Sequence, residues 1–109
     1  MPSTKTETTT LTATRAYRGT TPRMHKTIAG VTNQARDLLF TTLTNRPETA
    51  YVEYLDREKQ VGDHGTVYAF TGDEDVSHWD EVEHMDDRRD VWTGTVTVGI
   101  KAVFEVKDV

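Results

Sequence analysis

The stretch Val91–Val106, VWTGTVTVGIKAVFEV, decides the fold of this chain. Every second residue from Trp92 to Val106 is apolar or glycine, whereas the interleaved positions are mostly polar. Side chains of a β-strand alternate between its two faces, so the pattern predicts a strand with one face on a core and the other mostly in water. Such a strand would span roughly 50 Å, more than the diameter of about 35 Å of a compact domain this size. We therefore expect it either to bend at Gly94 or Gly99, or to project beyond its own domain.

The whole chain of 109 residues is long enough for one domain with one modest core. It contains no cysteine, which excludes disulfides and thiolate metal sites. No apolar run approaches the ~20 residues that cross a bilayer, and the polar N-terminus does not read as a secretory signal. These features predict a protein of the cytoplasm, or of a particle assembled there, without a membrane.

The net charge of −5 conceals two poles. Residues 1–47 carry seven Lys and Arg against two acidic residues, and residues 48–109 carry six against sixteen. Opposite poles favour head-to-tail contact between copies, although unevenly charged solvated faces would look the same. The twenty threonines, ten aspartates and five lysines also suggest adaptation to a highly saline host.

Residues 1–20 are rich in threonine and poor in apolar side chains, which predicts a flexible arm that orders against a neighbour. The alternative is a short strand with Leu11, Ala13 and Tyr17 on one face, because threonine favours strands. Arginines in and just after this segment are also compatible with phosphate contacts, but they are too few for a basic patch.

A helix over 22–44 follows from a threonine cap, proline at the first helical position and an apolar stripe spaced by three and four residues. The stripe consists of Met24, Ile28, Val31, Ala35, Leu38, Leu39 and Leu43. Pro47 ends the helix by restricting the residue before it.

Two strands, 49–56 and 66–71, follow as a hairpin joined by a charged loop with two glycines. Apolar residues then recur every three positions at Val76, Trp79, Val82 and Met85, which predicts a short helix over 76–88. The result is an α+β fold in which residues 21–109 form a single domain: a mostly antiparallel sheet with two helices packed on one side, preceded by an N-terminal arm over 1–20.

Catalytic and metal-binding patterns are weak. On a helix, Asp80 and His84 would share a face, and with His64 they form the best candidate metal site. The spacing matches no established metal motif, and the reading of a solvated acidic surface explains the same residues. We therefore expect no cofactor, no metal and no enzyme activity.

The order helix, hairpin, short helix and long terminal strand over residues 22–106 resembles the tail-completion and tail-terminator proteins of tailed viruses. That resemblance implies a homo-oligomeric ring, commonly of six copies, at the head–tail junction of a virion assembled in the host cytoplasm. It implies contact with the connector on one face and the tail-tube protein on the other, with DNA as passing cargo. Taken with this resemblance, the threonine- and aspartate-rich composition suggests a virus of a halophilic archaeon.

Subunit contacts are expected where the two charge poles meet. The predicted interface residues are Arg15, Arg18, Arg23, Lys26, Asp73, Glu74, Asp75, Glu81, Glu83, Trp79 and Trp92. The tryptophans belong in this set because their rings are favoured at the centres of interfaces. An alternative function is a small acidic binding module that mimics nucleic acid or inhibits a basic partner, and a metal-dependent enzyme is a third.

Overall fold

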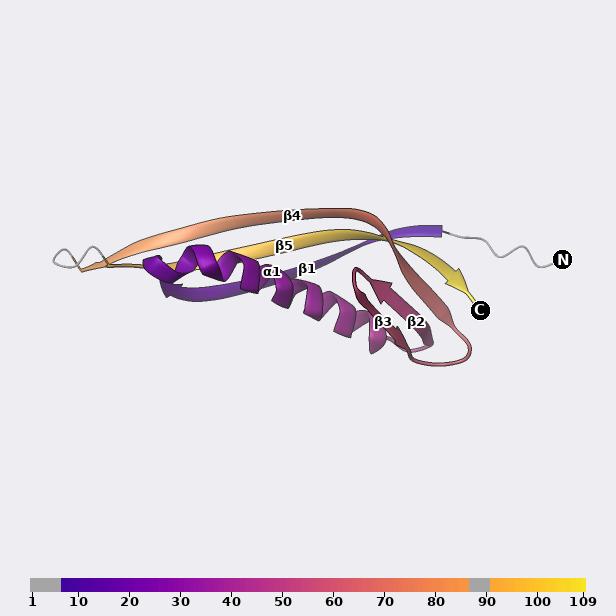
Figure 1. Cartoon of the computed structure of the whole chain (residues 1–109). Helices are drawn as coiled ribbons and strands as arrows, with labels where there is room; N and C mark the ends of the chain where they lie inside the picture. Colours follow the sequence, from indigo (N-terminus) through magenta and orange to yellow (C-terminus); the bar gives the residue numbers. More distant parts are fainter. Residues whose placement is uncertain (1–6, 87–90) are drawn as a thin grey trace.

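The predicted terminal strand is the spine of a five-stranded sheet with the order β1-β5-β4-β2-β3. The structure is a computed structural model that describes residues 7–86 and 91–109, with side chains described except at 20–27, 82–86 and 91–93. Its elements are β1 (Glu7–Thr20), α1 (Thr21–Thr44), β2 (Thr49–Tyr54), β3 (Arg57–Gln60), β4 (Thr66–Asp86) and β5 (Val91–Asp108). Figure 1 shows β1, β4 and β5 running together along the molecule, with α1 beside them and the short strands β2 and β3 at one end.

The alternation in β5 builds the core, as predicted. Its apolar positions from Val96 to Phe104 are at most 1% exposed, while the residues between them are partly or fully exposed. Phe104 packs against Tyr54 of β2 and Phe70 of β4, with ring centroids 5.3 and 5.8 Å away. The tilted and edge-on geometry of these rings is the arrangement that aromatic pairs prefer.

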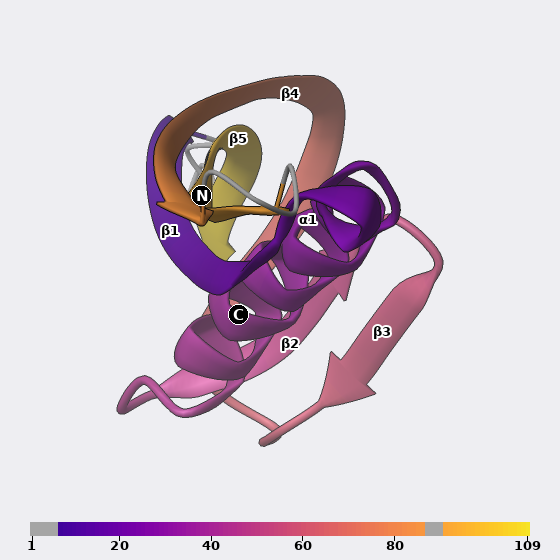
Figure 2. The same ribbon diagram turned by 90° about the vertical axis from the view of Figure 1, so that its left-hand side faces the viewer.

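The helix prediction is confirmed, since α1 covers 21–44. Val31, Ala35, Leu39 and Leu43 of the predicted stripe are buried, and Ile28 and Leu38 are partly buried against the same core. Met24 lies where side chains are not described. The helix packs on β1 and β5, and less on β2 and β4. The view in Figure 2 shows it against one face of the curved sheet, which we call the inner face.

The predicted flexible arm is wrong for residues 7–20, which form β1, whereas residues 1–6 lie outside the described part. β1 pairs with β5 over its whole length, from Glu7 opposite Val106 to Thr20 opposite Thr93. The strand alternative is therefore the correct one. The exposed side of β5 offers a complete ladder of hydrogen bonds, which stabilises a threonine-rich segment that has little apolar surface of its own.

The predicted hairpin of 49–56 with 66–71 is also wrong. β2 instead forms a hairpin with β3, a segment that the sequence suggested was a loop, and it pairs with β4 in parallel. After β3 the chain crosses back at Gly65, whose neighbour Thr66 donates its N–H to the Glu48 carbonyl at 2.7 Å. The sheet is therefore mixed rather than wholly antiparallel.

The second helix, predicted over 76–88, is wrong for residues 76–86, and residues 87–88 lie outside the described part. Residues 76–86 continue β4, which pairs with β5 antiparallel from Thr66 to Asp86. The period of three residues gave this segment only a narrow apolar edge, whereas strand pairing satisfies every second backbone group along a long neighbour. Pairing with β5 therefore outweighs the local helical preference of this segment.

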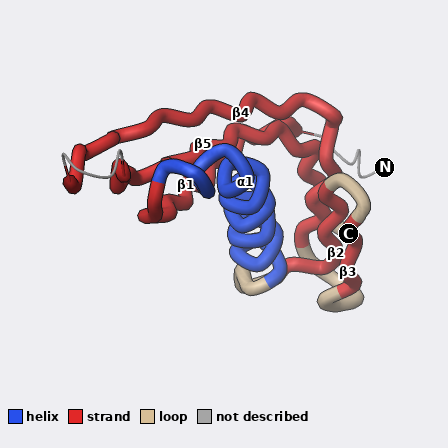
Figure 3. Tube along the Cα trace, turned by 60° about the vertical axis from the view of Figure 1, so that its left-hand side comes forward, coloured by secondary structure: helices blue, strands red, loops and turns tan. Residues whose placement is uncertain are grey.

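The molecule is a rod of 72 × 21 × 20 Å. Pairing of β5 with β1 passes through Gly94 and Gly99 without a shift in register, so the long strand projects rather than breaking at a glycine bulge. Figure 3 shows the strands extending well past the first turn of α1. Projection of this strand is one of the two outcomes expected from its length.

Candidate assembly surfaces

The rod contains a long three-stranded part, β1-β5-β4, that has two open edges. β2 pairs with β4 only through Thr66–Ala69, and a bulge separates Phe70 from Glu74. Beyond that bulge, and along all of β1, the described part of the chain provides no further strand partner. We call these the β4 edge (75–86) and the β1 edge (7–20). Unpaired N–H and C=O groups on such edges are ready to pair with another strand.

The two edges run in the same direction. β1 and β4 are each antiparallel to β5, so they are parallel to each other. Figure 1 shows them on the two sides of β5 along the rod. An interface between the β4 edge of one molecule and the β1 edge of another joins two different surfaces, and such contacts propagate head to tail.

Charge differs between the edges. The β1 edge carries the exposed Arg15 and Arg18, and Arg18 already has an interaction within its own chain. The β4 edge carries the exposed Asp75, Asp80 and Glu81. These residues belong to the two oppositely charged parts of the sequence, and the structure places them on opposite margins of one ribbon. Opposite charges across an interface select the partner and its orientation.

The β4 edge also exposes apolar side chains on both faces. Paired residues of neighbouring strands share a face, so Val76, opposite Ile100, points to the inner face, and Trp79, opposite Thr97, to the outer face. They are 45% and 49% exposed. The Trp79 ring lies over Gly99, where an added Cβ would be 3.6 Å from it. The free strand therefore exposes one large apolar side chain on each of its faces.

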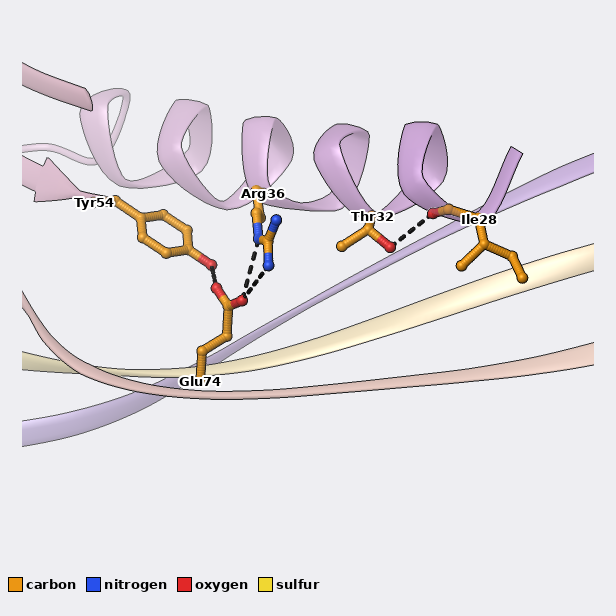
Figure 4. Close-up of polar contacts among 5 residues, drawn as sticks. All are labelled: Ile28, Thr32, Arg36, Tyr54 and Glu74. Carbon is orange, nitrogen blue, oxygen red and sulfur yellow. Dashed lines mark hydrogen bonds and ion pairs between the residues drawn. The ribbon is translucent and has the colours of Figure 1, made fainter. Parts of the chain in front are cut away.

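Glu74 is not part of this surface. The bulge turns it under the helix, where Arg36 donates to its Oε1 from Nε at 3.1 Å and from Nη2 at 2.6 Å, and the Tyr54 hydroxyl donates to Oε2. Figure 4 shows this cluster joining α1, β2 and β4. The Glu74 side chain is only 11% exposed. The prediction that Glu74 meets a neighbouring subunit is therefore wrong.

The cluster shifts the pKa values of its members. Burial acts to raise the pKa of Glu74, but hydrogen bonds from Arg36 and Tyr54 outweigh it and leave that pKa lowered. Burial and the hydrogen bond to Glu74 raise the pKa of Tyr54. The hydrogen bond to Glu74 also raises the pKa of Arg36. The carboxylate therefore stays ionised while the phenol stays protonated.

The other predicted interface residues fall in three places. Asp73 is exposed in the bulge, with its N–H donated to the Thr71 hydroxyl at 3.2 Å. Arg23 and Lys26 lie in the first turns of α1, and Glu83 and Trp92 lie near the far ends of β4 and β5. The side chains of these last four residues lie outside the described set. Val76 and Asp80 are edge residues that the expected interface omitted, because a helix over 76–88 concealed their alternation.

The candidate metal site loses its geometric basis. On a strand, Asp80 and His84 are about 13 Å apart along the chain axis, whereas a helix would have placed them one turn apart. His64 lies in the loop that precedes β4. Within the residues that the structure describes, no group of three His, Cys, Asp or Glu side chains is arranged to hold a metal ion.

Comparison with protein families, with curated proteins and with solved structures gives no match to this chain. Functional inference therefore depends on the geometry of the molecule itself. In the described part of the chain, no helix has the length and apolar character needed to cross a bilayer.

Proposed function

We propose that this chain is a structural protein that assembles head to tail into a ring through the β1 and β4 edges. The observation that carries the proposal is the pair of long open edges, parallel in direction and opposite in charge, on one ribbon. A heterologous contact forms a closed ring when its rotation closes and a filament when it does not. Val76 and Trp79 supply apolar area at the centre of the contact, and the charged residues fix its polarity.

We further propose that the ring is a neck component of a tailed virus, between the connector and the tail tube, with DNA passing through its lumen. The support is the resemblance in chain length, long helix and extended final strand, together with a geometry suited to head-to-tail contact. Two elements that contributed to the resemblance do not form: residues 49–56 and 66–71 are not a hairpin, and residues 76–86 are a strand instead of a second helix. About six copies and incorporation into a virion belong to this proposal because the resemblance implies them, and a halophilic host belongs to it because of the composition.

A charge swap tests the assembly proposal. Reversing Arg15 and Arg18 to Glu places like charges across the contact, and we expect assembly to weaken roughly tenfold or more. Adding Asp80→Arg and Glu81→Arg to the same chain should restore it. The control, Lys59→Glu with Lys107→Glu, makes the same charge change at exposed positions away from both edges and should assemble like the wild type.

Sedimentation velocity, with circular dichroism to verify folding, gives the readout for the swap. Pairing between these margins is contradicted if the Arg15→Glu/Arg18→Glu variant assembles fully. It is also contradicted if the variant that carries all four substitutions does not regain assembly. Because exposed ion pairs are screened by salt, the gap between the doubly reversed variant and the wild type should narrow as KCl is raised.

An acidic binding module remains a second candidate. The prediction of an acidic helix that mimics nucleic acid is wrong, because these residues belong to β4. The same acidic residues line the open β4 edge, where an extended basic segment of a partner can add as a further strand. A protein that stays monomeric and binds a basic peptide through the β4 edge would favour this function over the ring.

A further inference from the structure

We infer that the contact between copies is a continuation of the sheet, in which the β4 edge of one copy pairs in parallel with the β1 edge of the next. In this level register, a β4 residue lies opposite the β1 residue that pairs with the same position of β5. This inference rests on the proposed head-to-tail assembly and specifies its geometry. It follows from the strand directions, from the register of the two edges and from a groove beside β1.

Strand direction decides the symmetry. Two β4 edges, or two β1 edges, meet antiparallel in an isologous dimer, which uses one surface twice. A β4 edge against a β1 edge meets parallel when the sheet continues with the same face inward, because both strands oppose β5. The two negative margins repel each other in a β4–β4 dimer, whereas the mixed pairing brings opposite charges together.

Register matches the side chains on both faces. Residues of β1 and β4 that pair with the same β5 residue lie on one level across the ribbon. At that level, Trp79 falls opposite Ala16 of the next copy and Glu81 opposite its Arg18 on the outer face. On the inner face, Val76 falls opposite Ala13 of the next copy. At these three levels apolar residues meet apolar residues and opposite charges meet, while His78 falls opposite Arg15 and Asp80 opposite Tyr17 of the next copy.

A groove beside β1 fits the added strand. It has a volume of about 410 Å³ and lies between α1 and the inner face of β1, lined by Arg15, Gln34, Asp37, Leu38 and Thr41. A strand added to β1 directs alternate side chains to this side, here Val76, His78 and Asp80. The half-buried Leu38 offers apolar contact to Val76, and Arg15 lies one residue pair from Asp80, within reach across a diagonal.

Engineered cysteines test this geometry, because the natural chain contains none. Thr14 and Ser77 both pair with Gly99 and are exposed on the outer face. Within one chain they are two strand spacings apart, about 9.6 Å, too far for a disulfide, which needs Cα atoms closer than about 7 Å. Between copies in level register they are neighbours. The variant T14C/S77C, oxidised with diamide, should give covalent multimers larger than a dimer on a denaturing gel.

Two controls make the result specific. T10C/S77C offsets the pair by four residues, about 13 Å along the strand, and should cross-link at least tenfold less. S77C alone should give no more covalent dimer than a cysteine at the distant Lys59. Light scattering on each reduced variant establishes whether the non-covalent multimer is present.

The outcomes separate this inference from the proposed function. The level parallel pairing is overturned, and the ring is left standing, if the multimer is present in solution but the cross-linking pattern differs. The contradicting patterns are cross-linking by T10C/S77C, cross-linking by S77C alone, and no cross-linking by any variant. Absence of any multimer before oxidation overturns both. Multimers linked only by T14C/S77C support both.

Discussion

Gly65 is the residue on which the crossing between β3 and β4 depends. Its backbone φ of +125° is a value that residues with a side chain rarely adopt. An added Cβ would lie 1.9 Å from the Glu48 carbonyl oxygen. That oxygen cannot withdraw without breaking the hydrogen bond from Thr66 at 2.7 Å. The Gly65 main chain also exchanges two hydrogen bonds with Val109, at 3.1 and 2.9 Å.

We expect Gly65→Ala to lower the free energy of unfolding by about 3 kcal/mol or more, since it combines a steric overlap with backbone strain. Gly72→Ala is the matched control, because φ there is +97° but nothing lies within 4 Å of an added Cβ. It should cost only about 1–2 kcal/mol, the strain alone. Urea unfolding of both variants measures the difference, and equal losses would contradict the crossing as described.

The Arg36–Glu74–Tyr54 cluster acts at the scale of elements, because it connects the helix, the short sheet and the ribbon. Glu74→Gln keeps the shape of the side chain but leaves the guanidinium of Arg36 without its carboxylate. We expect a loss of about 1–3 kcal/mol, typical of a hydrogen bond to a charged group. Asp75→Asn, an exposed neighbour on the same strand, should change stability by less than about 0.5 kcal/mol.

This cluster also gives stability a pH dependence. The folded pKa of Glu74 is lowered from its ordinary value of 4.5, so its contribution is complete above that value and is lost as pH falls through the folded pKa. The deficit of Glu74→Gln relative to wild type should therefore shrink below pH 4.5. The pKa of Tyr54 is raised from 10.0, so its contribution is lost as pH rises above 10, and Tyr54→Phe should lack that alkaline loss. Thermal melts across pH measure both limbs, and a deficit independent of pH would show that the cluster is not ionised as described.

Sequence reasoning succeeded where one local pattern had one interpretation. The alternation of β5 and the stripe of α1 each identified a buried face, and both faces are buried in the structure. It failed where the interpretation depended on a distant strand. Val76, Trp79 and Val82 fit a helix locally, but the long strand β5 has β1 on one side and pairs on its other side with residues 66–86, which draws this segment into β4.

The candidate site was predicted in its chemistry but not in its geometry. Opposite charge poles were evident from the sequence, whereas their position on two margins of one ribbon required the strand order. Glu74 could not be separated from its acidic neighbours, because only the bulge after Phe70 turns it toward Arg36. A polar residue between an aromatic strand and an acidic run carries no signal of burial in the sequence.

At the scale of the whole molecule, the fold is a 72 Å rod whose two long margins are left open. Proteins that remain monomeric usually shorten, cover or bend such edges. Here the β4 edge carries acidic residues, whose charge opposes pairing with a second β4 edge. The β1 edge carries arginines, which would neutralise this charge if the two kinds of edge met. These open, oppositely charged margins are the support for the proposal that the rod is one segment of a larger sheet.

The most direct test of self-assembly through these edges is the molar mass of the purified protein by light scattering, in low salt and again in molar KCl. The account predicts one discrete multimer of the 12.4 kDa chain, of about six copies for a closed head-to-tail ring. A protein that remains monomeric in both salts across the accessible concentration range would contradict the account.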